Sequence, residues 1–377
     1  MKSIFCKLSL LFRTQISIPG KTILILLLSL FISSFGYSQT GWYSVTDSVG
    51  RLYLSSVQFT SENTGYSCGS YGNTCTGVFL KTTNAGLNWQ RTEYSTRTID
   101  EVYFLNSLTG YYIGWTFLTG YYSGYIYKTT DGAVSWARKD SIQAGNFFKI
   151  KFYDVNTGMV AGKYGGAYLT TNGGVNWNAV HSNNSWMEPS GIWCLDANTW
   201  FIGDGSRLNK TTNQGQNWNL IDSIYGGPIY FLNSVTGFAA SSYGNIYKTT
   251  NSGNNWLKIC NGGIEVFAPF ALTFTSTNTG YMSAYNSNKV YKTINGGYNW
   301  IALSVNQNFW GGYSLSFIND NTGYVSSTSG RIYKTTNGGT VFVSNISSEV
   351  PEKYSLGQNY PNPYNPISNF KSLLSSC

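Results

Sequence analysis

Residues 247–256 read YKTTNSGNNW, and residues 291–300 read YKTINGGYNW. The 377-residue chain contains seven matches to this motif, separated on average by about 42 residues. The matches end as TTNAGLNW (82–89), TTDGAVSW (129–136), TTNGGVNW (170–177), TTNQGQNW (211–218), TTNSGNNW (249–256), TINGGYNW (293–300) and TTNGGTVF (335–342). A period of this length indicates structural repeats, each the size of one four-stranded sheet.

A second motif precedes each match at a fairly regular interval. Its copies are FTSENTG (59–65), FLNSLTG (104–110), FYDVNTG (152–158), CLDANTW (194–200), FLNSVTG (231–237), FTSTNTG (274–280) and FINDNTG (317–323). Asn, Ser, Thr and Gly suit chain reversals, so each repeat predicts four strands joined by three turns. One such sheet cannot bury both of its apolar faces alone, whereas a closed ring of sheets leaves neither uncovered. The predicted fold class is all-β, a seven-bladed β-propeller of four-stranded antiparallel blades.

The turn before the last strand of each repeat can be explained position by position. Its Asn or Asp is expected to accept hydrogen bonds from amides of the same turn, and the glycine two residues later permits a positive φ. The terminal Trp offers a large apolar surface to the next blade. These structural positions are Asn84, Gly86, Trp89, Asp131, Trp136, Asn172, Gly174, Trp177, Asn213, Gly215, Trp218, Asn251, Gly253, Trp256, Asn295, Gly297, Trp300, Asn337, Gly339 and Phe342. The second copy departs from the pattern, with Gly132 one place early and Ala133 at the glycine position.

We place the propeller at residues 39–345. The sequence GWYSV at 41–45 resembles the closing strand of a blade, while the last repeat has its own segment around Phe342. The sequence leaves open which of the two supplies the outer strand of blade seven.

Residues 1–38 have the pattern of a signal peptide. Four basic residues, Lys2, Lys7, Arg13 and Lys21, precede the apolar run 22–35, and small residues follow it. The run is too short for a convincing membrane span, so we expect export with no membrane span after cleavage. Cleavage lowers the formal charge from +8 to +4, which makes nucleic acid a poor partner. Six lysines recur at one repeat position and are expected to disperse around the ring: Lys81, Lys128, Lys210, Lys248, Lys292 and Lys334.

The pattern S/T-x-D/N-x-G-x-x-W resembles the BNR or Asp-box repeat of sialidases and sortilin-type receptors. The wider repeat is similar to the photosystem II stability and assembly factor-like propellers of bacteria, a resemblance that covers about four fifths of the chain. It implies a propeller but allows enzymes, receptors and assembly factors alike.

The C-terminal residues 346–377 form a linker and a short tail. From Tyr354, YSLGQNYPNPYNPISNF resembles the start of the C-terminal sorting domain of the type IX secretion system, but the residues after Phe370 depart from that domain. This truncated segment implies a secreted or cell-surface protein if it functions, and a periplasmic one otherwise. A decayed reading frame is a further interpretation of the same tail.

The acidic residues do not form an obvious catalytic set. Asp131, Asp154 and Asp196 occupy turn positions, and His181 is the single histidine, so no metal or other cofactor is expected. The other acids in candidate inter-blade loops are Glu93, Asp140, Glu188, Asp222 and Glu265, and their spacing does not pair them. We predict a protein that is not an enzyme. The alternative is an Asp-box-type glycoside hydrolase, sialidase-like or related, which would require two loop carboxylates roughly 5 to 10 Å apart at the channel mouth.

A binding surface remains. Aromatic residues lie in the loops that lead from one blade to the next and in an insertion of blade two, namely Trp115, Tyr121, Tyr122, Trp186, Phe267 and Trp310. Exposed aromatics can stack on sugars or anchor a protein, although the same residues could cap the ends of the channel or begin inner strands. We therefore predict a monomeric binding or assembly scaffold for protein or polysaccharide at the cell surface. Cys68 and Cys75 flank a hairpin turn and are the candidate disulfide.

Overall fold

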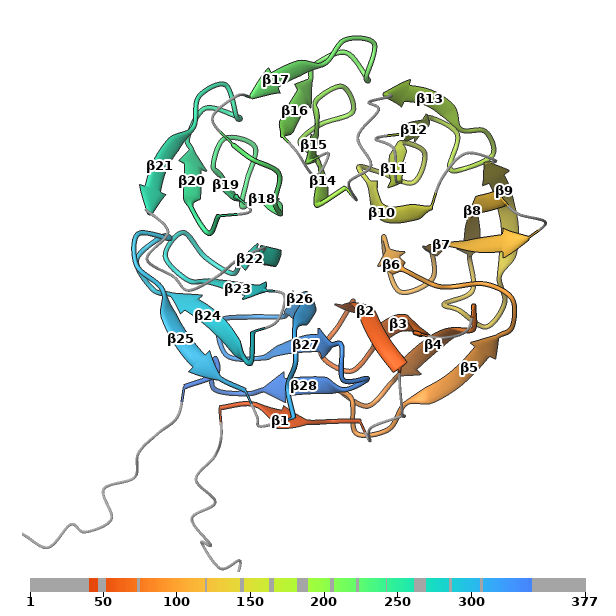
Figure 1. The fold of residues 1–377 in the computed structure, drawn as a ribbon, viewed down its shortest axis with the longest axis horizontal. Helices are drawn as coiled ribbons and strands as arrows, with labels where there is room; N and C mark the ends of the chain where they lie inside the picture. The colour runs from red at the N-terminus through yellow and green to blue at the C-terminus, as the bar shows by residue number, and fades with distance from the viewer. Residues whose placement is uncertain are drawn as a thin grey trace, which may run out of the picture. The chain divides into compact units, whose positions relative to one another are not determined.

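The computed structural model describes residues 41–46, 52–72, 75–118, 121–142, 146–162, 166–181, 189–203, 207–221, 224–241, 243–260, 269–284, 287–305 and 308–340. All of them belong to one compact unit, Gln39–Val341. Their strands form seven sheets of four strands each, arranged as blades around a central axis (Figure 1). The predicted seven-bladed propeller is confirmed, and no helix occurs in the described ranges.

The strands of blades one to six follow one another from the channel outward. Blade one consists of β2 (Leu52–Phe59), β3 (Gly65–Tyr71), β4 (Gly77–Thr82) and β5 (Gln90–Tyr94). Blade two consists of β6 (Glu101–Phe104), β7 (Gly110–Leu118), β8 (Tyr121–Thr129) and β9 (Ala137–Ile142). Blade three consists of β10 (Phe147–Phe152), β11 (Gly158–Gly162), β12 (Ala167–Thr170) and β13 (Asn178–His181).

Blades four to six repeat this order. Blade four consists of β14 (Gly191–Cys194), β15 (Trp200–Gly203), β16 (Leu208–Thr211) and β17 (Asn219–Ile221). Blade five consists of β18 (Ile229–Phe231), β19 (Gly237–Ala240), β20 (Ile246–Thr249) and β21 (Leu257–Cys260). Blade six consists of β22 (Pro269–Phe274), β23 (Gly280–Ala284), β24 (Lys289–Thr293) and β25 (Ile301–Ser304).

Blade seven combines the two ends of the repeat region. Its inner strands are β26 (Gly312–Phe317), β27 (Gly323–Ser327) and β28 (Ile332–Thr335), and its outer strand is β1 (Tyr43–Ser44). Tyr43 pairs with Lys334, and the Val45 amide donates to the Ile332 carbonyl at 2.8 Å. The N-terminal segment therefore supplies the closing strand, while Phe342 lies outside the described residues.

Each blade contributes turns to both faces of the ring. Because neighbouring strands are antiparallel, the first and third turns lie on one face, which we call the Asx-turn face. The second turn and the crossover to the next blade lie on the opposite face, which we call the crossover face.

The third turn of each blade is held by a threonine and an Asn or Asp. In blade one the Thr82 hydroxyl donates to Asn84 Oδ1 at 2.9 Å and accepts the Gly86 amide at 3.0 Å. Asn84 Oδ1 also accepts the Asn88 amide at 2.9 Å, and Gly86 has φ of +83°. The buried threonine thus stabilises the turn together with the asparagine. The sequence motif includes this threonine, but a structural role was predicted only for the asparagine, the glycine and the tryptophan.

Aromatic side chains fill the seams between blades in a repeated arrangement. Phe59, at the end of β2, stacks on Tyr324 of blade seven with ring centroids 3.5 Å apart, and it meets the edge of Trp89 at 5.9 Å. The corresponding groups at other seams are Tyr66–Phe104–Trp136, Tyr111–Phe152–Trp177, Phe238–Phe274–Trp300 and Tyr281–Phe317–Trp42. Each tryptophan faces the preceding blade, so the expected contact with the next blade was wrong in direction.

Trp42 takes the place that a repeat tryptophan occupies in the other blades. It is fully buried and lies edge-on to Phe317, with centroids 5.9 Å apart and planes at 86°. The Trp89–Phe59 pair of blade one has nearly the same geometry, 5.9 Å and 88°. The N-terminal segment that closes the ring thus also supplies the indole that packs against Phe317.

The repeat lysines join neighbouring blades. Lys81 Nζ donates to the Gly132 carbonyl of blade two at 2.6 Å, and Lys128 Nζ donates to the Gly173 carbonyl of blade three at 2.9 Å. Lys210, Lys292 and Lys334 make the same kind of bond, the last of them across the closing seam to Ala85. These lysines are dispersed as expected, but their ammonium groups fasten one Asx turn to the preceding blade.

Candidate functional site

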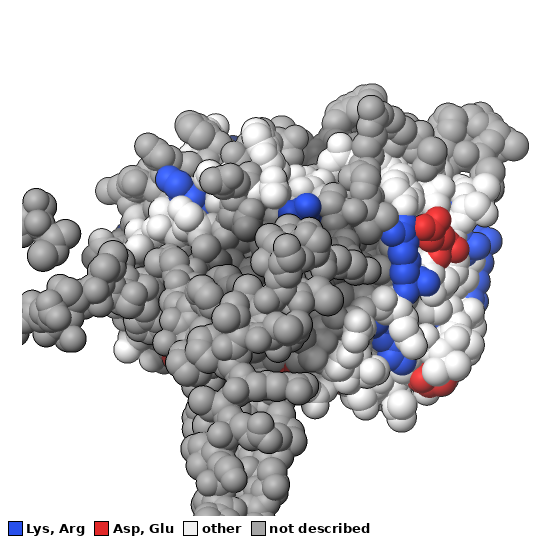
Figure 2. All heavy atoms as spheres, turned by 90° about the horizontal axis from the view of Figure 1, so that it is seen from below, with Lys and Arg blue, Asp and Glu red and all other residues white. Residues whose placement is uncertain are grey.

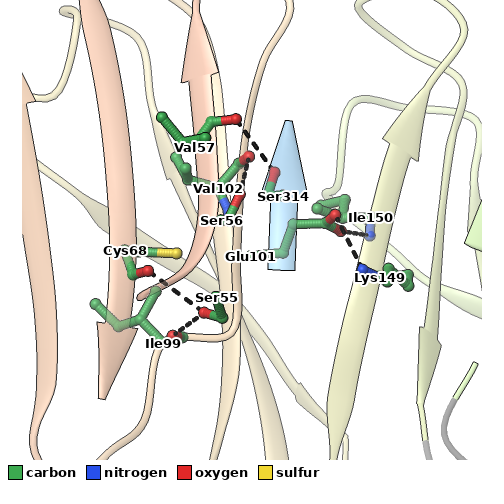
Figure 3. A network of polar contacts seen from close by, with 10 residues as sticks. All are labelled: Ser55, Ser56, Val57, Cys68, Ile99, Glu101, Val102, Lys149, Ile150 and Ser314. Carbon is green, nitrogen blue, oxygen red and sulfur yellow. Dashed lines mark hydrogen bonds and ion pairs between the residues drawn. The ribbon is translucent and has the colours of Figure 1, made fainter. Parts of the chain in front are cut away.

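The channel wall is formed by the innermost strands, whose channel-facing backbone edges have no strand partner. Side chains of one blade satisfy these edges in the next. Gln58 exchanges two hydrogen bonds with the Phe104 backbone, at 2.7 and 3.0 Å. The Ser56 hydroxyl likewise donates to the Val102 carbonyl and accepts the Val102 amide, and the Ser314 hydroxyl donates to the Val57 carbonyl (Figure 3). Polar residues in this wall therefore have a structural task, because buried backbone groups need partners.

Glu101 is the acid of the channel wall. Its carboxylate points from β6 toward blade three, where it accepts the Ile150 amide and lies 3.8 Å from Lys149 Nζ (Figure 3). Burial raises the pKa of Glu101, and the charge of Lys149 opposes that shift. The carboxylate thus interacts with a backbone amide of an unpaired strand edge and with one lysine.

Lys151 lies in β10, two residues after Lys149. Its Nζ is 4.3 Å from the centroid of a Trp193 ring and 5.2 Å from that of Tyr103. Burial lowers the pKa of Lys151, while Cys194 and Glu101 favour its charged form. The ammonium is held mainly by aromatic faces, an arrangement worth about 0.5–2 kcal/mol.

The two acids near the crossover face also have partners. Glu93 pairs with Arg91 at 2.5 Å, and Asp100 accepts the Thr98 hydroxyl at 2.8 Å. Among the other hydrolase candidates, Glu188, Asp222 and Glu265 lie outside the described residues, as does the side chain of Asp140. Within the described ranges, no group of three His, Cys, Asp or Glu side chains could hold a metal ion.

Trp310 is displayed by a fixed loop on the crossover face. Its side chain is 62% exposed, and its carbonyl accepts the Thr328 amide at 3.1 Å. Gly311 follows with φ of +54° and donates to the Ser287 carbonyl at 3.1 Å, while Phe309 is buried beneath. Bonds to blades six and seven therefore fix the backbone that carries this exposed indole.

The other predicted aromatics have different outcomes. Trp115 is half-buried in β7, and its backbone exchanges hydrogen bonds with Thr98 of the preceding crossover. Tyr121 and Tyr122 lie in β8, but their side chains are outside what the structure describes, as are Trp186 and Phe267 entirely. The described residues do not bring these aromatics together with Trp310.

Sequence reasoning missed an aromatic pair on the crossover face of blades four and five. Tyr225 and Tyr243 are 45% and 62% exposed, with ring centroids 5.9 Å apart. The Arg207 guanidinium lies 5.1 Å from the Tyr225 ring centroid. Tyr243 lies in the second turn of blade five, between β19 and β20, and second turns share the face of the crossovers.

The predicted disulfide between Cys68 and Cys75 is not formed, and both thiols are free. Cys68 is buried in β3 opposite Phe79, while Cys75 comes four residues before Phe79 at the far end of the hairpin. Strand geometry puts the two roughly 10 Å or more apart, beyond the reach of a disulfide. Burial raises the pKa of the Cys68 thiol further, as expected for an inert core residue.

The described outer surface carries few charges. On the side of the ring seen in Figure 2, basic and acidic groups lie close together among a larger number of uncharged residues. The part of the chain that the structure describes contains no helix that could span a membrane.

No protein-family model matches the sequence, and no curated protein matches it either. Solved structures do resemble it. A YCF48 structure bound to D1 peptide has a TM-score of 0.60 at 16% identity, covering 79% of this chain and 97% of that chain. YCF48 from Cyanidioschyzon merolae has a TM-score of 0.57 at 15% identity, covering 78% and 98%. An ancestral GH74 enzyme has a TM-score of 0.60 at 18% identity, covering 79% of this chain but 46% of that chain. At these identities the likeness shows the propeller fold alone.

Proposed function

We propose that the protein is an exported, non-catalytic scaffold that binds a protein segment through the crossover face of the propeller. The observation that carries the proposal is the exposure of Trp310, Tyr225 and Tyr243 on that face. Aromatic side chains on a preordered backbone supply contact area at little entropic cost, and Tyr, Trp and Arg dominate binding energies at protein interfaces.

A peptide is the favoured ligand class. The YCF48 propeller, which has the same fold, is described as bound to D1 peptide. Arg207 beside Tyr225 adds a cationic group of the kind that suits peptide carbonyls and carboxylates. Polysaccharide is the second ligand class, because sugars also stack on exposed aromatic rings.

The non-catalytic part of the proposal rests on the acids. Glu101 and Glu93 are engaged by a strand edge or by a neighbouring cation. A hydrolase would instead keep two carboxylates directed at a substrate. The structural likeness to a GH74 enzyme indicates only that a related ring can carry such chemistry.

A binding screen tests the function. The mature protein is applied to arrays of extracellular protein segments and of glycans, together with Trp310→Ala and Tyr243→Ala. Tyr298→Ala is the matched control, because Tyr298 is 50% exposed but lies on the Asx-turn face. We expect the first two variants to weaken binding of the selected ligand and the control to leave it unchanged. Equal binding by all four proteins would show that the crossover face is not the binding face.

Export is a separate part of the proposal. It rests on the sequence of residues 1–38 and the QNYPNP tail. Cell fractionation followed by N-terminal sequencing tests it, with a mature N-terminus near Gln39 as the expected result and an intact leader on a cytoplasmic protein as the contrary one.

A further inference from the structure

The Asx-turn face of blades one to three exposes a run of large apolar side chains. Six of them are between 47% and 80% exposed, and we call them the apolar belt: Leu87, Leu108, Val134, Tyr153, Val155 and Val175. Single exposed apolar residues are ordinary on protein surfaces, whereas a cluster on one face indicates an interaction site.

Hydrogen bonds hold the turns of the apolar belt together. In blade two the Gly132 amide donates to the Leu108 carbonyl at 2.9 Å, and in blade three Gly173 donates to Asn156 at 2.8 Å. Between blades, the lysine bonds from Lys81 to Gly132 and from Lys128 to Gly173 connect successive turns. The turns that carry the six side chains are therefore held in place by hydrogen bonds within blades two and three and between successive blades.

Folding of the turn does not require these apolar residues. The position of Leu87 in its turn is filled by Gln216 in blade four, Asn254 in blade five and Thr340 in blade seven. Those turns make the same bonds from threonine to Asn, for example Thr211 to Asn213 at 2.9 Å. The repeat itself is thus a control, and it shows that polar residues serve the fold equally well.

Exposed carboxylates accompany the apolar belt. Glu62, Asp131 and Asp154 lie in turns of the same three blades and are exposed. Hydrogen bonds from their own turns lower the pKa of Asp131 and Asp154, so both stay ionised at neutral pH. The ammonium groups of Lys81 and Lys128 are instead bonded to carbonyls in the seams. The exposed charge beside the belt is negative.

We infer that the apolar belt docks a cationic, apolar segment of a partner protein. Apolar contacts would supply affinity, and the flanking carboxylates would select Lys or Arg side chains over acidic ones. An anionic lipid surface would be repelled by the same carboxylates. This site is on the opposite face from the one assigned to the proposed function and does not depend on it.

The test uses the mature protein and two synthetic peptides, one of leucine and lysine and one of leucine and glutamate in the same order. Fluorescence anisotropy should show tighter binding of the lysine peptide. The triple variant Leu87→Ser, Val134→Ser, Val175→Ser should weaken that binding by about tenfold or more. The matched control is Leu220→Ser, Leu257→Ser, Ile301→Ser, which changes three other exposed apolar residues, on outer strands, and should have no such effect.

A second variant removes charge without removing the turns. Asn stands at the position of Asp131 in the other six copies and at that of Asp154 in three, so Asp131→Asn with Asp154→Asn keeps the Oδ1 acceptor on which each turn depends. It should weaken binding of the lysine peptide by about threefold or more, an effect that salt removes. Asp320→Asn, outside the apolar belt, should leave binding unchanged.

Four results would overturn the inference. Equal binding of both peptides would indicate nonspecific binding, and so would an equal loss of affinity in the control triple variant. A dimer in sedimentation that the belt variant dissociates would identify a second copy as the occupant. Stronger binding to anionic vesicles than to neutral ones would identify a lipid surface. The charge variant keeps the inference testable even if the triple variant has a lowered Tm.

Discussion

Replacing Trp42 by alanine should destabilise the ring more than any other single change in the closing segment. The indole is fully buried against Phe317, in the place of a repeat tryptophan. Truncation of a buried Trp costs about 3–5 kcal/mol, because the transfer free energy is lost and a cavity remains. The matched control is Tyr43→Ala, next along the chain but 44% exposed, which should cost about 0.5 kcal/mol or less.

Two measurements check this prediction. Urea denaturation gives the free energy of unfolding of each variant, and hydrogen exchange shows where protection is lost. We expect Trp42→Ala to release the amides of β26–β28 while those of blade four keep their protection. A cost for Trp42→Ala close to that for Tyr43→Ala would refute the reasoning, since the indole would then contribute nothing to closure. Loss of protection spread evenly over all blades would refute the local role.

Three further predictions concern the turns, the seams and pH. Thr82→Val removes the three hydrogen bonds of a buried hydroxyl and should cost about 1–3 kcal/mol in urea denaturation, whereas Thr83→Val, at an exposed position, should be nearly neutral. Lys210→Met loses bonds from Nζ to the Ser252 carbonyl and to Asn254 Oδ1, at 2.9 and 2.7 Å, and should lower the thermal midpoint, while Lys258→Met on an outer strand should not. Burial raises the pKa of Tyr111 and other seam tyrosines above the ordinary value of about 10, so their stabilising effect is complete below pH ~10 and is lost as pH rises beyond it. Circular dichroism and absorbance at alkaline pH should therefore show unfolding together with phenolate formation; phenolate formation in a folded ring would contradict this.

The number of blades could be predicted from the sequence because the Asx turn is a local structure. Thr82, Asn84 and Gly86 bond within one short segment, so each copy of the motif reports its own turn. Closure of the ring by the N-terminal strand could not be predicted in this way. The hydrogen bond from the Ile332 amide to the Thr46 hydroxyl joins residues 286 apart, and β1, a strand of two residues, has no local signal strong enough to exclude the Phe342 segment.

The blade that each side chain contacts across a seam also could not be predicted from the sequence. The repeat tryptophans were assigned to the correct kind of contact but to the wrong neighbour, because spacing along the chain does not give the hand of packing between sheets. The lysines were interpreted as scattered surface charge, although Lys334 bonds to Ala85 across the closing seam. A cation recurring at one position of every repeat is a signal for a repeated structural bond.

The candidate site was predictable where a residue departs from the repeat. Trp310 stood apart from the template, and its side chain is exposed. Tyr243 was missed because it lies in an ordinary glycine-containing turn, whose exposure depends on which face of the ring the turn reaches. The apolar belt was missed for the opposite reason, since Leu87 and Val134 sit inside the motif that was taken to be purely structural.

The interlocking of β1 with β28 bears on how the protein can be assembled during synthesis. Among the strands of the propeller β1 leaves the ribosome first, yet its partner β28 emerges only after six complete blades. Until then Trp42 has no Phe317 to pack on. The folded blades form an open arc, and its first and last sheets each expose one face to solvent. Folding of this chain therefore concludes with the meeting of its earliest and latest strands.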